Sequence, residues 1–283
     1  MSEFFLLIVF IFLAVKFRAS IEERELRSLK HQHQWDFIKH QGEGRIAILA
    51  LHGFGVCPQL FDPWFNQWRD NGWSYSIPML TGSVQSLYAF EKSKWEDWEQ
   101  KALTAYDELQ SQHEKVFVVG FSNGGLTAIR VAQLRSPNSL VLLAPFFGLA
   151  SPLGPLGERI LSSLRIFSSG IFIPNKGLDC SNKEGVRHLF RFKHSPLRAV
   201  LELLKFRDLV IRSGVVNCPV FWSHSKRDHV ASYSVSLNAV LNLSSNVQKV
   251  PLQNSFHYIL HDVESEFLKQ KAIDFLIQQA NLK

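Results

Sequence analysis

The sequence predicts an α/β fold in which a mostly parallel central sheet is covered by helices on both faces. From residue 45 onward, short and almost entirely apolar segments recur along the chain, and such segments are typical of buried parallel strands. Segments with helical periodicity separate several of them, as parallel strands require. The alternation is interrupted between residues 148 and 215, where we expect a cap inserted into the core.

The individual elements follow from their apolar patterns and from the glycine, proline or polar residues that close them. We expect strands at 46–51, 73–77, 116–121, 140–144, 220–223 and 247–250. We expect helices at 95–111, 124–134 and 267–281. The core is then formed by residues 45–147 and 216–283, with residues 148–215 as the cap.

Size and composition indicate one packed domain. The chain has 283 residues, of which 46% are hydrophobic and 20% are charged, so a hydrophobic core forms and general disorder is excluded. The three cysteines form neither an even set nor a Cys-x-x-Cys pair, which argues against a disulfide scaffold and a cysteine-based zinc site.

The positive charge of the chain is unevenly distributed. The formal net charge is +6, and the excess lies in residues 151–215, which also contain apolar stretches at 164–167 and 171–174. A basic and apolar segment suits an anionic membrane surface or a lipid-like substrate, although an ordinary solvated helical surface accounts for it equally well. No DNA- or RNA-binding motif accompanies the charge, so we expect no nucleic-acid partner.

The N-terminus begins with an unbroken apolar run from Phe4 to Val15, followed by Lys16 and Arg18. The run is shorter than the roughly 20 residues of a full membrane span, but it reaches that length if the two basic side chains extend to the interface. We therefore predict that residues 1–19 are a membrane anchor. A cleaved signal peptide and a buried core helix are the alternatives, and the missing positive charge before the run disfavours the signal.

The residues after the apolar run set the expected orientation. Basic side chains follow the run and none precedes it, which by the positive-inside rule places the remaining chain on the cytoplasmic side. A secreted or periplasmic location is the alternative. Residues 20–44 are expected to form a charged stalk, in which His31 and His33 belong to a solvated linker rather than to a metal site.

A candidate nucleophile lies between the expected strand 116–121 and the helix 124–134. The sequence there, GFSNG at 120–124, has the G-x-S-x-G pattern of a nucleophile elbow. The glycines allow a strained turn that places the hydroxyl of Ser122 at the carboxyl edge of the sheet, beside a helix N-terminus. The alternative is a serine that only caps the helix.

A serine nucleophile needs a base and an orienting carboxylate, which follow it in the order Asp or Glu and then His. Asp228 follows the strand 220–223 and His257 follows the strand 247–250. Both loops leave the sheet at the same edge as Ser122, so we expect these three residues to form a catalytic triad. The alternative residues are His224, His229, His261, Asp179 and Asp208; we expect His261 to be a surface or helix-start histidine.

Acyl transfer also needs donors for the oxyanion. The backbone N–H groups of Phe54 and Asn123 are the candidates, because Asn123 follows the nucleophile and Phe54 lies in the loop after the strand 46–51. His52 precedes the serine, and we interpret it as a structural residue bonded to neighbouring backbone. This chemistry requires no cofactor and no metal.

Five segments together resemble the bacterial carboxylesterases and monoacylglycerol lipases of the α/β-hydrolase superfamily. They are LHGFGVCP at 51–58, PMLTG at 78–82, WEDW at 95–98, VGFSNGG at 119–125 and NSFH at 254–257 with Asp262. The resemblance covers about residues 45–280. It implies the α/β-hydrolase fold, Ser122, Asp228 and His257 as the triad, and Phe54 and Asn123 as oxyanion donors. The chain departs from the family at Gly55, Ser83 and Asn123, which affects the acyl pocket.

The expected function is a serine hydrolase that cleaves carboxylic esters through an acyl-enzyme on Ser122. A small acyl ester, such as a monoacylglycerol or a short-to-medium acyl ester, is the expected substrate. The alternatives are an acyltransferase or thioesterase with the same triad, and a non-catalytic, membrane-tethered module. We expect an acyl channel lined by Leu153, Leu156, Phe167 and Phe172 of the cap.

Overall fold

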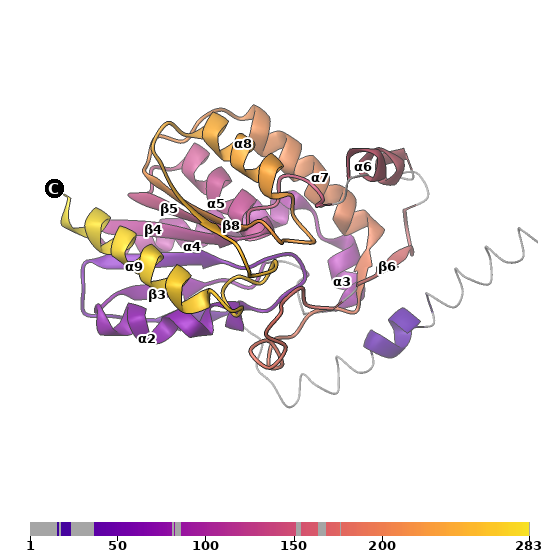
Figure 1. Cartoon of the computed structure of the whole chain (residues 1–283), viewed down its shortest axis with the longest axis horizontal. Helices are drawn as coiled ribbons and strands as arrows, with labels where there is room; N and C mark the ends of the chain where they lie inside the picture. Colours follow the sequence, from indigo (N-terminus) through magenta and orange to yellow (C-terminus); the bar gives the residue numbers. More distant parts are fainter. Residues whose placement is uncertain are drawn as a thin grey trace, which may run out of the picture.

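A seven-stranded sheet forms the centre of the protein (Figure 1). The computed structural model describes residues 16, 18–23, 37–80, 82, 86–150, 154–163, 168–175 and 177–282. The strand order is β1-β3-β2-β4-β5-β8-β9, and only β1 is antiparallel to its neighbour. The strands are β1 (Ile38–His40), β2 (Ile46–Leu51), β3 (Ser74–Ile77), β4 (Lys115–Phe121), β5 (Ser139–Leu143), β8 (Val220–Ser225) and β9 (Val247–Leu252). The expected α/β fold with a mostly parallel sheet is thus confirmed.

Helices cover both faces of the sheet because its inner strands are apolar on both sides. In β4, Val116 and Val118 face one hydrophobic cluster, whereas Phe117 and Val119 face the other. One face packs against η1 (Pro58–Phe61), α2 (Asp62–Asp70) and α9 (Ser265–Asn281). The other packs against α3 (Leu87–Lys92), α4 (Trp95–Gln112), α5 (Asn123–Leu134), α7 (Leu197–Arg212) and α8 (Tyr233–Leu243).

The segment between β5 and β8 contains its own small elements. They are α6 (Gly154–Ser163), the antiparallel pair β6 (Phe172–Pro174) and β7 (His194–Pro196), and α7. Helix α7 packs against α3, α4 and α5, so its apolar face joins the core, whereas α6 lies at the periphery (Figure 1). This segment corresponds to the region expected to form a cap.

The structure differs from the expected stalk at residues 20–44. Residues 18–23 are helical, and Glu22 and Glu23 are buried. The Glu22 carboxylate accepts hydrogen bonds from the Lys193 backbone and from Nδ1 of His194, the latter at 2.6 Å. The Glu23 carboxylate accepts the backbone N–H of Leu87 at the start of α3, at 2.7 Å. Glu22 therefore binds the cap, and Glu23 binds the start of α3. A run of charged residues in the sequence does not reveal these contacts.

The strand β1 also belongs to the segment expected as stalk. It pairs with β3 through Ile38 and Ile77, so the sheet begins before residue 45. The strand has only three residues and contains Lys39 and His40, which is why no apolar run marks it in the sequence.

The predicted membrane anchor, residues 1–19, lies largely outside the described residues, since residues 1–15 and 17 are not among them. In the part of the chain that is described, no helix has both the length and the apolar character needed to cross a membrane.

Replacing Glu22 with alanine should destabilise the protein by about 3 kcal/mol, because a buried histidine and a backbone N–H lose their acceptor. Chemical denaturation measures this as a lower midpoint of unfolding. Replacement of the exposed Glu43 with alanine is the control and should change stability by less than about 0.5 kcal/mol. Equal midpoints for both variants would show that residues 18–23 do not pack against the cap.

Candidate active site

Ser122 occupies a strained turn between β4 and α5. Its φ of 55° and ψ of −116° lie outside the regions that residues with a side chain normally adopt. A side chain at Gly120 would overlap the backbone of Gly124, and one at Gly124 would overlap the backbone of Leu51. The two glycines therefore allow the chain to turn closely at the serine, as the G-x-S-x-G pattern predicts.

Hydrogen bonds to neighbouring strand ends hold the turn in place. The Ser122 N–H donates to the Leu143 carbonyl at 3.0 Å. The Ser122 carbonyl accepts the N–H of Gly125 at 3.0 Å and that of Phe146 at 3.2 Å. The nucleophile candidate is therefore fixed by the end of β5 as well as by its own helix.

The structure brings Ser122, His257 and Asp228 together at the carboxyl edge of the sheet. Oγ of Ser122 lies 3.1 Å from Nε2 of His257. Nδ1 of His257 lies 2.6 Å from Oδ2 of Asp228. With the proton on Nδ1, the ring donates to the carboxylate and Nε2 accepts from the serine hydroxyl, which is the arrangement that activates a nucleophile.

The environment of Asp228 favours its ionised form. Burial alone would raise the pKa of this carboxyl group, but the charges and hydrogen bonds of His257 and His224 outweigh burial and hold the pKa well below its usual range. Oδ1 also accepts the backbone N–H groups of Val230 and Ala231, both at 2.7 Å. The carboxylate is thus negatively charged and fixed in position opposite the imidazole.

His224, which the sequence also offered as a base, does not contact Ser122. Its Nε2 lies 3.0 Å from Oδ2 of Asp228 and 3.1 Å from the carbonyl of Ala231. Its Nδ1 is buried without a hydrogen-bond partner among the described residues, so the proton belongs on Nε2. His224 therefore acts as a second donor to the Asp228 carboxylate. Its place one residue before the end of β8 is the sequence signal for this role.

Asp179 and Asp208, which also follow Ser122 in the chain, have structural roles. The Asp179 carboxylate accepts the backbone N–H groups of His229 and His257, each at 3.1 Å. It therefore connects the two loops that carry the triad residues Asp228 and His257. Asp208 pairs with Arg207 on α7.

His261 is buried, so the surface half of its prediction is wrong, and it lies in the turn just before α9. Its Nε2 donates to the Leu60 carbonyl at 2.8 Å. Because Leu60 belongs to η1, this hydrogen bond joins the turn after His257 to the helices on one face of the sheet.

The residues expected to supply the oxyanion donors, Phe54 and Asn123, lie near Ser122 in the chain or in space. The N–H of Asn123 is the first of α5 and has no acceptor within the helix. The loop that carries Phe54 runs directly against the elbow, since a Cβ on Gly53 would lie 3.3 Å from Cβ of Ser122.

His52 is structural, as expected. The ring is buried. Its Nδ1 lies 3.0 Å from the Gly53 carbonyl oxygen, and its Nε2 accepts the backbone N–H of Leu80 at 3.0 Å. Burial lowers the pKa of His52 to about 4, against the smaller opposing effect of the hydrogen bond with Gly53.

A cavity of about 320 Å³ adjoins Ser122 and His257. Its lining is mainly apolar, and among the described residues Arg191 is the only one there with a permanent charge. The described lining residues are Phe54, Phe121, Ser122, Phe146, Leu149, Ile173, Asn175, Arg191, Ser195, Val200, Leu203, Val230, His257 and Tyr258. A hollow of about 590 Å³ between α4 and the β1–β3 edge is larger, but it contains none of the triad residues, so chemistry rather than size identifies the site.

The cap residues expected to line an acyl channel do not do so where they are described. Leu156 is exposed on α6, and Phe172 packs against Tyr88. Leu153 and Phe167 lie outside the described residues. The described cap residues that line the cavity instead are Leu149, Ile173, Asn175, Arg191, Ser195, Val200 and Leu203. The periodicity of the cap sequence does not show which of its faces meets the core.

Replacing His224 with leucine should lower kcat/KM for ester hydrolysis about tenfold or more, because the Asp228 carboxylate loses a charge-assisted hydrogen bond. A glutamine at this position retains an N–H donor and should restore most of the activity. Steady-state kinetics, with thermal unfolding as a check of folding, measures both effects. Equal losses in the leucine and glutamine variants would show that the donor is unimportant.

Known proteins with this architecture include several lipases. The chain is 22% identical over 245 residues to a thermostable monoacylglycerol lipase from Bacillus sp. (strain H-257), which covers 84% of this chain and 92% of the lipase. A solved structure reported for the metagenome-derived lipolytic enzymes LipS and LipT has a TM-score of 0.76 at 20% identity, covering 86% of this chain and 97% of that chain. The monoacylglycerol lipase of Paleococcus ferrophilus has a TM-score of 0.72 at 17% identity, covering 86% and 98%.

A family model identifies the chain directly. The model described as serine aminopeptidase, S33, matches residues 42–264, which include both parts of the core and the segment between them. The matched range ends just before α9 and so leaves out the last helix of the core. The match and the sheet topology confirm the resemblance inferred from the sequence motifs. The chain therefore belongs to the serine aminopeptidase S33 family of α/β-hydrolases.

Proposed function

We propose that the protein hydrolyses carboxylic esters through an acyl-enzyme on Ser122. The observation that carries this proposal is the continuous hydrogen-bond chain from Ser122 through His257 to Asp228, at the wall of a mainly apolar cavity. Such a chain makes a serine hydroxyl nucleophilic, and the cavity provides space for an acyl group beside it.

The proposed steps use the three triad residues and two backbone N–H groups. Nε2 of His257 takes the hydroxyl proton as Oγ of Ser122 attacks the ester carbonyl carbon. The backbone N–H groups of Phe54 and Asn123 stabilise the oxyanion. His257 then gives its proton to the leaving alcohol, and the acyl group remains on Oγ. Water, deprotonated by the same imidazole, attacks the acyl carbonyl. His257 then returns this proton to Oγ as the bond between Oγ and the acyl group breaks, which releases the carboxylic acid and the free serine.

The charge of the cavity favours esters over peptides with a free N-terminus. The family description refers to aminopeptidases, and an aminopeptidase must bind the ammonium group of its substrate, for which a carboxylate is the natural partner. None of the described lining residues is an aspartate or glutamate, and Arg191 brings a positive charge. A cation in this cavity would therefore meet a like charge and an apolar wall.

Monoacylglycerols and other esters of short-to-medium acyl chains are the proposed substrate class. Relatives with similar folds are monoacylglycerol lipases by name. A volume of about 320 Å³ lies at the lower end of small-molecule sites, which suits a single acyl chain.

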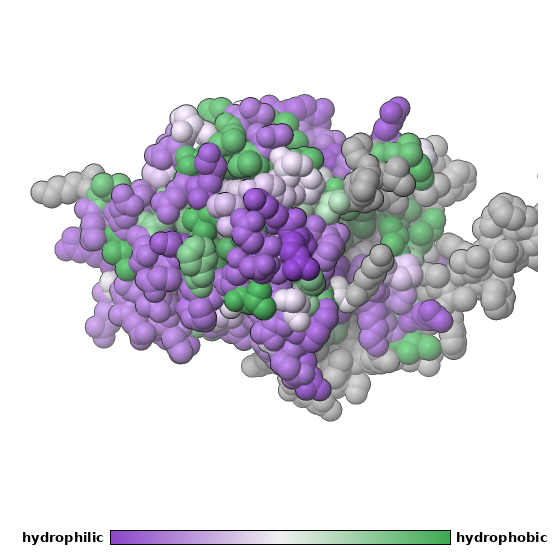
Figure 2. All heavy atoms as spheres, viewed as in Figure 1, coloured by the Kyte–Doolittle hydropathy of each residue, from purple (hydrophilic) through white to green (hydrophobic). Residues whose placement is uncertain are grey.

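Action at a lipid surface is part of the proposal. On α6, Leu156 is 54% exposed and Ile160 is 53% exposed, one turn apart, and Figure 2 shows apolar atoms gathered at this place. Together with the positive charge of residues 151–215, this face suits an anionic lipid surface. Ala19 is buried in the core of the domain, so the predicted anchor ends before it. The apolar run from Phe4 to Val15 would anchor the enzyme there, with the catalytic domain on the cytoplasmic side.

Replacing Ser122 with alanine should reduce hydrolysis of 4-nitrophenyl butyrate by about a thousandfold or more, because the nucleophile is removed. It should also abolish labelling by a fluorophosphonate probe, mapped to Ser122 by mass spectrometry. The control is Ser139→Ala, which removes a buried hydroxyl from β5 that has no partner among the described residues. Full hydrolysis by the Ser122 variant would refute the proposal.

Selectivity between two acyl groups of similar length tests the charge argument. The 4-nitrophenyl ester of butyrate should have a kcat/KM at least about tenfold above that of the corresponding 2-aminobutyrate ester, because the ammonium group meets Arg191 and an apolar wall. In an Arg191→Gln variant the ratio should fall. A preference for the amino ester would favour the aminopeptidase alternative.

A further inference from the structure

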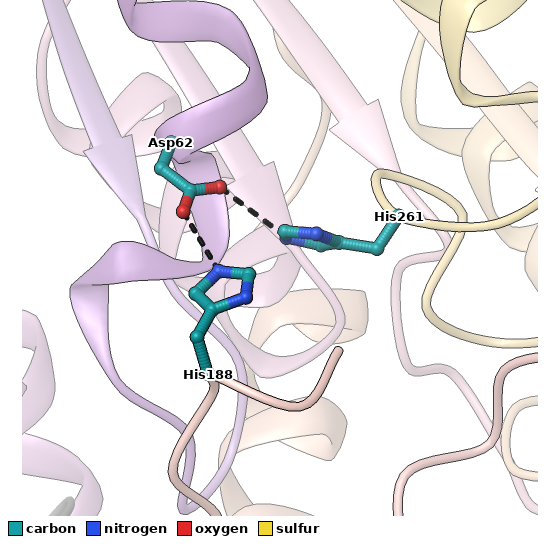
Figure 3. A group of neighbouring side chains, drawn as sticks. All are labelled: Asp62, His188 and His261. Carbon is teal, nitrogen blue, oxygen red and sulfur yellow. Dashed lines mark ion pairs between the residues drawn. The ribbon is translucent and has the colours of Figure 1, made fainter. Parts of the chain in front are cut away.

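A second group of titratable side chains lies where the cap meets α2, and none of its members lines the cavity beside Ser122. Asp62 is the first residue of α2, His188 belongs to the cap segment between β6 and β7, and His261 lies on the turn that follows His257. Figure 3 shows the three side chains pointing toward one another from three separate parts of the chain. No other described residues bring three such ligand groups together.

The distances within this group suit a shared metal ion. Nε2 of His188 lies 2.7 Å from Oδ2 of Asp62, and Nε2 of His261 lies 3.9 Å from Oδ1. The three ligand atoms all lie within 4.8 Å of one another. Ligands of a tetrahedral zinc ion, with bonds of about 2.0–2.1 Å, lie about 3.3 Å apart. The widest pair therefore has to close by about 1.5 Å at most.

The exposure of the side chains permits this adjustment. His188 is 47% exposed and Asp62 is 36% exposed, so both rotate without disturbing the core. The side chain of His261 is only 4% exposed and is held in place. One fixed ligand and two adjustable ones at the surface leave room for water as a further ligand.

The donor set selects the kind of ion. Two imidazoles and one carboxylate suit Zn²⁺ and its neighbours Ni²⁺ and Cu²⁺. Ca²⁺ and Mg²⁺ need more oxygen ligands than the group offers. Of these borderline ions, Zn²⁺ accepts a tetrahedral site with three protein ligands and an open position.

The ring of His261 is hydrogen-bonded to the backbone of η1 in this structure. Without metal, Nε2–H donates to the Leu60 carbonyl at 2.8 Å. Metal binding to Nε2 therefore requires the ring proton to move to Nδ1 and the Leu60 carbonyl to give up this hydrogen bond.

We propose that Asp62, His188 and His261 form a Zn²⁺ site that clamps the cap segment onto the core. The ion is structural, since the ester chemistry at Ser122 proceeds without it. Its location has a consequence for the active site, because the N–H of His261 donates to the Tyr258 carbonyl within the turn that starts at His257. Zinc therefore tethers the cap to the loop that carries the catalytic imidazole.

Zinc binding to the full chain tests this proposal directly. Protein stripped with a chelator and desalted is titrated with Zn²⁺ in competition with a chromogenic chelator. The wild type should have one site whose affinity falls at least tenfold in His188→Ala and in Asp62→Asn, since each removes a ligand. The matched control is His229→Ala, because His229 is also an exposed histidine paired with an aspartate, Asp179, but lacks a third ligand among the described residues. Its zinc affinity should equal that of the wild type.

Thermal unfolding gives a second readout that does not depend on ester hydrolysis. Zinc at about 100 times its Kd should raise the Tm of the wild type and of His229→Ala by about 5 °C. At the same zinc concentration the rise in Tm of His188→Ala should be at most about half as large, because a site at least tenfold weaker is then at no more than about 10 times its Kd. The Tm of each variant without metal shows whether that variant is folded. If His188→Ala is unfolded, Asp62→Asn takes its place in this measurement. Equal zinc affinity in wild type and both ligand variants, or no bound zinc in the wild type, would overturn the proposal.

Discussion

The backbone conformation of Ser122 is the constraint on which the active site depends. A residue with a side chain at φ 55° is strained by about 1–3 kcal/mol, and such strain persists only where the surroundings enforce it. Here the surroundings are the end of β5, which accepts the Ser122 N–H, and the first turn of α5, which donates to its carbonyl. The sheet therefore does more than carry the nucleophile, because its strand ends hold the hydroxyl toward His257.

The opposite wall of the site depends on buried charge. Asp228 keeps its ionised form in a buried position because four donors, from His224, His257 and two backbone N–H groups, converge on it. An ionised carboxylate in turn fixes the tautomer of His257, so that Nε2 faces the serine hydroxyl. The loops after β8 and β9 are also joined by Asp179 from the cap segment. The Asp179 carboxylate thus links the cap segment to the two loops that carry Asp228 and His257.

The sequence predicted what depends on local pattern. Apolar runs marked the inner strands, and the order of Ser122, Asp228 and His257 after successive strands placed them at one edge, where the structure brings them together. It could not predict what depends on long-range partners. Glu22 looked like part of a solvated stalk because its partner, His194, lies far along the chain. The burial of His261 was not predicted, because its hydrogen-bond partner, the Leu60 carbonyl, lies far away in the chain.

In such a site, the cavity walls select substrates by disfavouring some chemical groups as well as by binding others. The same triad cleaves esters and amides, so Ser122, His257 and Asp228 alone do not distinguish an esterase from an aminopeptidase. The distinction comes from the walls, where apolar side chains and one guanidinium make an ammonium group expensive to bind. A neutral acyl chain meets no such penalty. In the proposed function, the preference for esters over peptides with a free N-terminus arises from the residues around the cavity, among which Arg191 carries the one permanent charge of the described lining.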